Sequence, residues 1–123
     1  MELLLLSSST KHGTGFLEHA LPAVAELLAG RERLLFVPFA KQDHDAYAAT
    51  VQAAVEPLGI TVEGLHRAAD PVAAVREAQA VFVGGGNTFR LLAALHRLGI
   101  VAPLREAVRG GTPYLGASAG TNM

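Results

Sequence analysis

The first candidate for a catalytic residue is a serine that is surrounded by small residues. Ser118 stands in the stretch GASAGTNM and completes the pattern G-x-S-x-G, with Gly116 and Gly120 on either side. Small neighbours let a chain turn sharply from a strand into a helix, which exposes the serine hydroxyl beside N–H groups that can bind an oxyanion. The pattern therefore predicts a nucleophilic serine. A serine- and glycine-rich turn without a catalytic role is the alternative that this short pattern leaves open.

A second candidate is the glycine-rich stretch VGGGNTFRLL. Gly84, Gly85 and Gly86 follow an apolar run, and Asn87 is placed to cap the next helix. Because glycine lets a backbone approach a ligand closely, the N–H groups of Gly85, Gly86 and Asn87 are expected to be free to bind an anion or an oxyanion. The stretch matches neither nucleotide-binding motif: no Gly-Lys-Ser/Thr follows, and Phe89 replaces the third glycine of G-x-G-x-x-G. A tight loop capped by Asn87 is the plain structural alternative.

The five histidines do not identify a general base. His12, His44 and His66 follow predicted strands, whereas His19 and His96 fall within predicted helices. Serine activation needs a base within hydrogen-bond reach, and no spacing selects one of the five, so we expect surface histidines. No two of them have the spacing of a metal site, so no metal is expected.

The composition fits a single α/β domain. Of 123 residues, 50% are hydrophobic and 17% are charged, the mean hydropathy is +0.32, and the formal net charge is −1. Apolar strands are typical of sheets covered on both faces. The near-neutral charge gives no reason to expect nucleic acid as a partner, and no cysteine is present for disulfides. The apolar run at residues 3–6 is too short for a signal peptide or a membrane span, so we expect a cytoplasmic protein.

Short apolar runs alternate with segments of helical period, which predicts parallel strands joined by right-handed helical crossovers. The predicted strands cover residues 2–7, 33–40, 60–66, 80–86 and 112–118, and the predicted helices cover residues 15–30, 45–59, 70–79, 87–99 and 101–111. The expected fold is a three-layer α/β/α sandwich with a mainly parallel sheet, and the strand at residues 60–66, which alternates, should lie near an edge. Sites in such sheets form beyond the carboxyl ends of the strands. One such end holds the polar stretch KQDHDAY, where we expect a helix-capping loop, with Asp43 or Asp45 as the N-cap, rather than a pocket wall.

With both glycine-rich stretches identified, the chain resembles the peptidase E family of α-aspartyl dipeptidases, which are serine peptidases. The matching stretches follow the family order along the whole chain: MELLLLS, LEHALP, VPFA, HRAADPVAAV, VGGGNTFRLL and GASAGTN. The resemblance implies a sheet like that of class I glutamine amidotransferases. It also implies that Ser118 is the nucleophile and that the N–H groups of Gly86 and Ala119 form the oxyanion hole. The implied supporting residues are Gly84, Gly85, Asn87, Gly116 and Gly120.

The activity implied by the resemblance is removal of an N-terminal aspartate from Asp-X dipeptides, without a cofactor. Ala117 stands where the family often has a tryptophan. In the family, the general-base histidine, its acidic partner and the basic residue that recognises aspartate follow the serine turn, so none of the five histidines here gains a triad role. We therefore expect residues 1–123 to be the N-terminal part of a peptidase domain of about 230 residues.

Two expectations about activity and partners follow from the resemblance. The 123 residues alone should be inactive, because the base is missing. Their expected partner, besides a small peptide substrate, is the other half of the enzyme as a separate chain, or a second copy of this chain. Two alternative functions stay open: a related serine hydrolase for another acidic peptide of the cyanophycin type, and a non-catalytic α/β module that binds an anion.

Overall fold

The structure is a computed structural model that describes residues 3–5 and 21–116. Along the chain its elements are β1 (Leu3–Leu5), α2 (Leu21–Leu27), β2 (Arg33–Val37), α3 (His44–Val55), the 3-10 turn η1 (Glu56–Leu58), β3 (Thr61–Gly64), the 3-10 turn η2 (Leu65–Arg67), α4 (Pro71–Glu77), β4 (Val81–Val83), α5 (Thr88–Leu98), α6 (Val101–Arg109) and β5 (Tyr114–Gly116). Strands and helices alternate in the predicted order.

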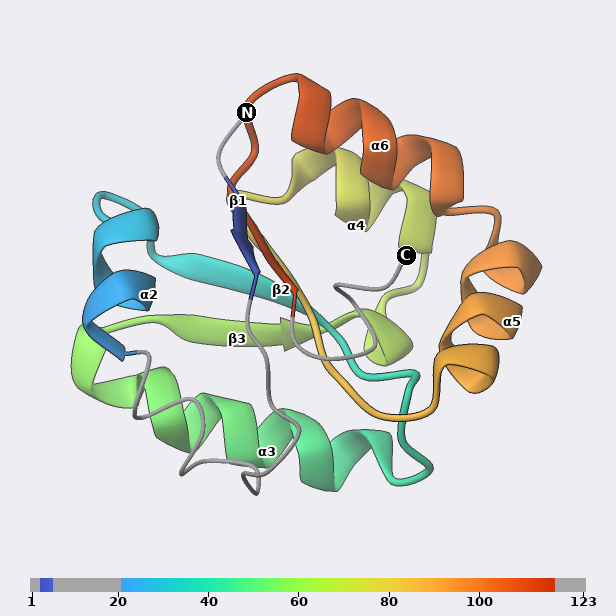
Figure 1. The fold of residues 1–123 in the computed structure, drawn as a ribbon, viewed down its shortest axis with the longest axis horizontal. Helices are drawn as coiled ribbons and strands as arrows, with labels where there is room; N and C mark the ends of the chain where they lie inside the picture. The colour runs from blue at the N-terminus through green and yellow to red at the C-terminus, as the bar shows by residue number, and fades with distance from the viewer. Residues whose placement is uncertain (1–2, 6–20, 117–123) are drawn as a thin grey trace.

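The five strands form one parallel sheet in the order β1-β5-β4-β2-β3 (Figure 1). The prediction of a parallel α/β sheet is confirmed, and β3 lies at an edge, as its alternating pattern indicated. The order also makes β4 and β5 neighbours, although α5 and α6 separate them in the sequence. Because parallel strands all run the same way, their carboxyl ends meet at one edge of the sheet.

Apolar layers cover both faces of the sheet. Successive strand residues point to opposite faces, so Leu34 and Phe36 of β2 pack into one cluster and Leu35 and Val37 into the other. The first cluster also contains buried residues of α2 and α3, and the second contains buried residues of α4, α5 and α6. Figure 1 shows α2 and α3 on one side of the sheet and α4 and α6 on the other. The predicted three-layer sandwich is confirmed.

Some element boundaries differ from the predictions. The helix predicted to residue 59 ends as an α-helix at Val55, because Pro57 has no N–H to continue the hydrogen-bond ladder. The strand predicted to residue 66 ends at Gly64, and His66 lies in η2. Of the helix predicted over residues 15–30, only α2 is among the described residues.

Side chains cap three helices at their N-termini. Asp43, and not Asp45, caps α3. Asp70 caps α4, and Asn87 caps α5 as predicted. Each side chain accepts a hydrogen bond from the N–H three residues on, at 3.0–3.2 Å. None of the helices in the described part of the chain is long and apolar enough to cross a membrane.

Candidate active site at the carboxyl ends of β4 and β5

The carboxyl ends of β4 and β5 lie side by side. Val83, the last residue of β4, pairs with Gly116, the last residue of β5. The glycine loop, by which we mean residues 84–87, therefore leaves the sheet beside the strand that leads on in sequence to Ser118. Both candidate stretches thus start from neighbouring strand ends.

Several of the histidines and predicted site residues lie outside the described residues. They are His12, His19, Ala117, Ser118, Ala119 and Gly120. Their predicted roles stay predictions. Of the G-x-S-x-G pattern, the structure describes Gly116, which is buried at the end of β5.

Backbone hydrogen bonds attach both ends of the glycine loop to the end of β2. The Gly84 N–H donates to the carbonyl oxygen of Val37 at 3.1 Å, and the Asn87 N–H donates to that of Ala40 at 2.8 Å. The prediction that the Asn87 N–H is free to bind an anion is therefore wrong. The side chain of Asn87 is occupied as well, since its Oδ1 caps α5.

Gly86 is exposed, and its N–H remains available as a hydrogen-bond donor. No acceptor for this N–H occurs among the described residues. The φ of Gly86 is +144°, a value that residues with side chains rarely adopt, and a Cβ there would lie 2.7 Å from the carbonyl oxygen of Ala40. Glycine is thus required at this position by both backbone angle and space. Gly85, in contrast, is buried.

Tyr47 of α3 also contacts the glycine loop. Its hydroxyl donates to the carbonyl oxygen of Gly85 at 3.0 Å. The hydroxyl also fills the space beside Gly84, where a Cβ would lie 2.6 Å from the Tyr47 oxygen. Burial raises the pKa of Tyr47 to about 12, so the phenol stays protonated and able to donate at physiological pH. In the sequence Tyr47 is the last residue of the polar stretch KQDHDAY, within the helix predicted over residues 45–59, and nothing there indicates this contact.

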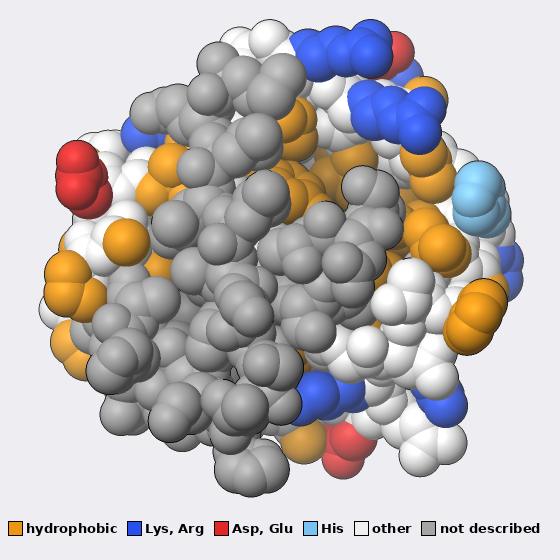
Figure 2. Space-filling view, in the orientation of Figure 1, with side chains coloured by type: hydrophobic (Ala, Val, Ile, Leu, Met, Phe, Trp, Pro, Cys, Tyr) orange, Lys and Arg blue, Asp and Glu red, His pale blue; other side chains and the backbone are white. Residues whose placement is uncertain are grey.

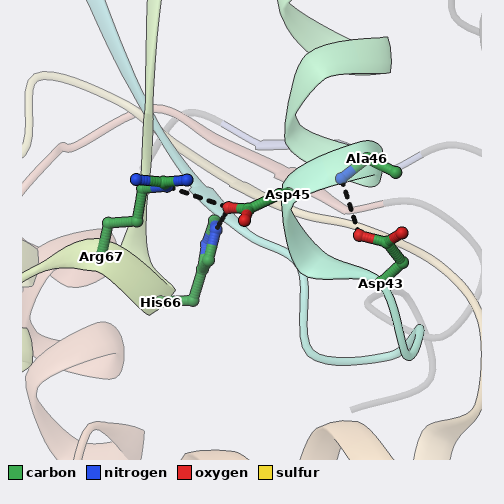
Figure 3. Close-up of polar contacts among 5 residues, drawn as sticks. All are labelled: Asp43, Asp45, Ala46, His66 and Arg67. Carbon is green, nitrogen blue, oxygen red and sulfur yellow. Dashed lines mark hydrogen bonds and ion pairs between the residues drawn. The ribbon is translucent and has the colours of Figure 1, made fainter.

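A second polar cluster joins the start of α3 to η2 (Figure 3). One carboxylate oxygen of Asp45 accepts from His66 Nε2 at 2.7 Å and from Arg67 Nε at 2.9 Å, while Asp43 faces away and caps the helix. The hydrogen bond from Arg67, followed by that from His66, lowers the pKa of the Asp45 carboxyl. The other ring nitrogen of His66, Nδ1, is buried and has no hydrogen-bond partner among the described residues.

This cluster holds α3 to η2, which directly follows the edge strand β3. The His66 ring lies against Gly64, where a Cβ would be 2.3 Å from the ring carbon Cε1, so the unpartnered Nδ1 faces backbone rather than a pocket. Two strands, β2 and β4, separate β3 from β5, which at the usual strand spacing amounts to about 14 Å. A hydrogen bond cannot cover that distance. The cluster therefore does not contact the end of β5, which leads to Ser118, and we assign it a structural role.

The described histidines differ in exposure. His66 is only 11% exposed, so the expectation of a surface histidine is wrong for this residue. His44, the first residue of α3, is partly buried, and its ring contacts those of Phe39 and His66 at centroid distances of 5.1 and 5.6 Å. His96 is exposed on α5, as expected. Among the described residues, no group of three or more histidine and acidic side chains is arranged to hold a metal ion.

The surface over α5 and α6 is mixed in character. Figure 2 shows Lys and Arg side chains over α6, and hydrophobic side chains over α5. Phe89, in the first turn of α5 directly after the glycine loop, is 85% exposed. The residue that interrupts the dinucleotide-binding motif is thus a solvent-facing aromatic next to the candidate site.

Comparisons with known proteins agree with the fold and the motifs. Residues 3–123 match peptidase family S51. The chain is 59% identical over its whole length to peptidase E of Streptomyces coelicolor, covering 51% of that protein, and 54% identical to a Drosophila melanogaster protein named probable alpha-aspartyl dipeptidase, with 98% of this chain and 52% of the relative aligned. The crystal structure of a Listeria monocytogenes EGD-e protein provisionally assigned to peptidase E superposes with a TM-score of 0.71 at 28% identity, over 94% of this chain and 58% of that one. The chain spans about half the length of the curated relatives it matches. By its sequence and its sheet, this chain belongs to peptidase family S51.

Proposed function

We propose that the complete protein is a serine dipeptidase that removes N-terminal aspartate from Asp-X dipeptides through an acyl-enzyme on Ser118. Membership of a peptidase family supports hydrolysis, and the names of two relatives, peptidase E and alpha-aspartyl dipeptidase, support the substrate class. The single observation that favours a hydrolytic site most is the pairing of Val83 with Gly116. This pairing starts the glycine loop and the segment with Ser118 from adjacent strand ends, as a nucleophile and its oxyanion donor require.

The proposed reaction proceeds in two steps. Ser118 Oγ attacks the carbonyl carbon of the aspartyl residue, and its proton passes to a general base. The N–H groups of Gly86 and Ala119 stabilise the resulting oxyanion. The C–N bond then breaks, the base returns the proton to the leaving amine, and the aspartyl group remains as an ester on Ser118. Water attacks the ester, which releases aspartate and regenerates the serine.

Serine reactivity tests the nucleophile independently of the substrate. We expect a fluorophosphonate to label the full-length protein at Ser118, and Ser118→Ala to lose both labelling and about 10⁴- to 10⁶-fold in kcat. Thr50→Ala is the matched control, because it also removes one hydroxyl, from a residue whose Oγ1 donates to the carbonyl oxygen of Ala46 within α3. Labelling at another residue, or none, would overturn the serine mechanism and favour the non-catalytic anion-binding module.

A substrate panel tests the specificity. Full-length protein is incubated with Asp-X, Glu-X and isoaspartyl dipeptides, and release of the free amino acid is measured. We expect cleavage of Asp-X above the others. Labelling of Ser118 without Asp-X cleavage would instead favour the related hydrolase for another acidic peptide.

The proposal extends to partners and location. We expect residues 1–123 alone to release no aspartate, and turnover by that purified fragment without a second chain would contradict this. A separate chain with the second half, or a second copy, would co-elute with it in size-exclusion chromatography. A cytoplasmic location, also proposed, is checked by cell fractionation.

A further inference from the structure

We propose that Tyr47 is a positioning residue that holds the Gly86 N–H in the orientation of an oxyanion donor. The inference rests on the proposed function and adds to it a residue that neither the glycine loop nor the serine pattern contains. It starts from one contact: the Tyr47 hydroxyl donates to the carbonyl oxygen of Gly85 at 3.0 Å.

That carbonyl belongs to the same peptide unit as the Gly86 N–H. In a trans peptide the C=O and N–H point in opposite directions within one plane, so fixing the carbonyl also fixes the N–H. The plane lies between two glycines, which restrict it least of all residues. Without the hydroxyl, rotation of this plane would turn the N–H away from its site. The hydrogen bond also polarises the peptide, which strengthens the N–H as a donor.

Among the described residues, no other hydrogen bond reaches the centre of the loop. Its ends are held by the carbonyls of Val37 and Ala40, which accept from Gly84 and Asn87. Neither bond involves the peptide between Gly85 and Gly86. Within the described residues, the Tyr47 hydroxyl is thus the group that fixes the middle of the loop.

Tyr47 itself is firmly placed. Its ring packs edge-on against Phe36 at a centroid distance of 4.8 Å, and Lys41 Nζ lies over the ring, 4.4 Å from its centroid. The absence of a side chain at Gly84 provides the space for the hydroxyl. A partly buried phenol whose ring contacts both Phe36 and Lys41 can impose its geometry on a flexible peptide.

The test compares Tyr47→Phe with wild type in the full-length protein. The variant keeps the ring and loses one hydrogen bond, so we expect kcat for an Asp-X dipeptide to fall about 3- to 10-fold. Because an oxyanion exists only after attack, KM should change by less than about 2-fold. The rate at which a fluorophosphonate labels Ser118 should fall by a similar factor. Thermal unfolding is measured in parallel.

Tyr114→Phe is the matched control, since Tyr114 is the other tyrosine, is also partly buried, and lies at the amino end of β5. We expect it to leave kcat and the labelling rate unchanged, whatever it does to the unfolding temperature. Tyr47→Phe with unchanged kcat, or with a raised KM alone, would overturn the inference while Ser118 catalysis stands. If wild type neither cleaves Asp-X nor is labelled at Ser118, the proposed function fails, and the inference fails with it.

Discussion

Replacing Gly86 by alanine tests whether glycine is needed at this position because the loop backbone packs closely against the backbone of Ala40. A Cβ at this position would lie 2.7 Å from the carbonyl oxygen of Ala40 and 3.0 Å from its carbonyl carbon. Neither is a flexible group, because both belong to the backbone just beyond β2. The same carbonyl accepts the Asn87 N–H at 2.8 Å, so moving it away would also stretch that bond.

Two costs add in Gly86→Ala. A residue with a side chain at a φ of +144° carries strain of about 1–3 kcal/mol. Forcing an extra methyl group into occupied space costs about 1–3 kcal/mol more. Together the free energy of unfolding should fall by about 2–6 kcal/mol. If the loop relieves the contact by shifting, the Gly86 N–H moves, and kcat should fall by about 10²- to 10³-fold, as when an oxyanion donor is removed.

Gly99→Ala provides the comparison. Gly99 also has a positive φ, +67°, but a Cβ there would have nothing within 4 Å, so only the backbone cost of about 1–2 kcal/mol applies. Urea unfolding and Asp-X turnover are measured for both variants of the full-length protein. If Gly86→Ala is no more destabilising than Gly99→Ala and retains wild-type kcat, then neither the steric argument nor the role of the loop is correct.

Two further predictions concern stability. The lowered pKa of Asp45 means that its pairing with Arg67 and His66 stabilises the fold above the unfolded pKa of 3.8, and that this stabilisation is lost as the pH falls through the lower folded value. Asp45→Asn should therefore be less stable than wild type at neutral pH, with the difference disappearing in acid; a difference independent of pH in urea unfolding would contradict this. Leu95→Ala, which empties a fully buried site in the core, should cost about 2–5 kcal/mol. Phe89→Ala, at an 85% exposed site, should change stability by less than about 0.5 kcal/mol, and equal losses at both sites would refute the assignment of the core.

Local sequence patterns predicted the helices and strands well, because the start and end of each helix or strand depend on residues only a few positions apart. Asn87 caps α5 through the N–H of Arg90, three residues on, and the glycine at position 99 ends that helix with a positive φ. Pro57 likewise explains why α3 ends before residue 59, although the apolar pattern continues. The spacing of apolar residues carries no information on the N–H that proline lacks, so the predicted end of the helix lay several residues beyond Val55.

Contacts between distant residues required the tertiary structure. The sequence placed Asp45 in the polar stretch KQDHDAY after a predicted strand, but did not indicate that it would pair with His66, 21 residues away. The three glycines after β4 indicated that another group would lie close to the loop backbone. Nothing in the local sequence identified that group as Tyr47, which stands 38 residues before Gly85.

By itself, the sequence determined the order of strands and helices, the parallel α/β class, the two glycine-rich stretches and the family. These features are recorded in composition, short-range periodicity and motifs. Only the tertiary structure decided that β4 lies between β2 and β5, which sets the glycine loop against Ala40 and Tyr47 on one side and beside the end of β5 on the other. Strand order depends on how whole layers of side chains pack together, and no spacing along the chain encodes it. For the same reason, the sequence predicted a donor role for the Gly86 N–H but gave no sign that the Tyr47 hydroxyl would bond to the carbonyl oxygen of Gly85.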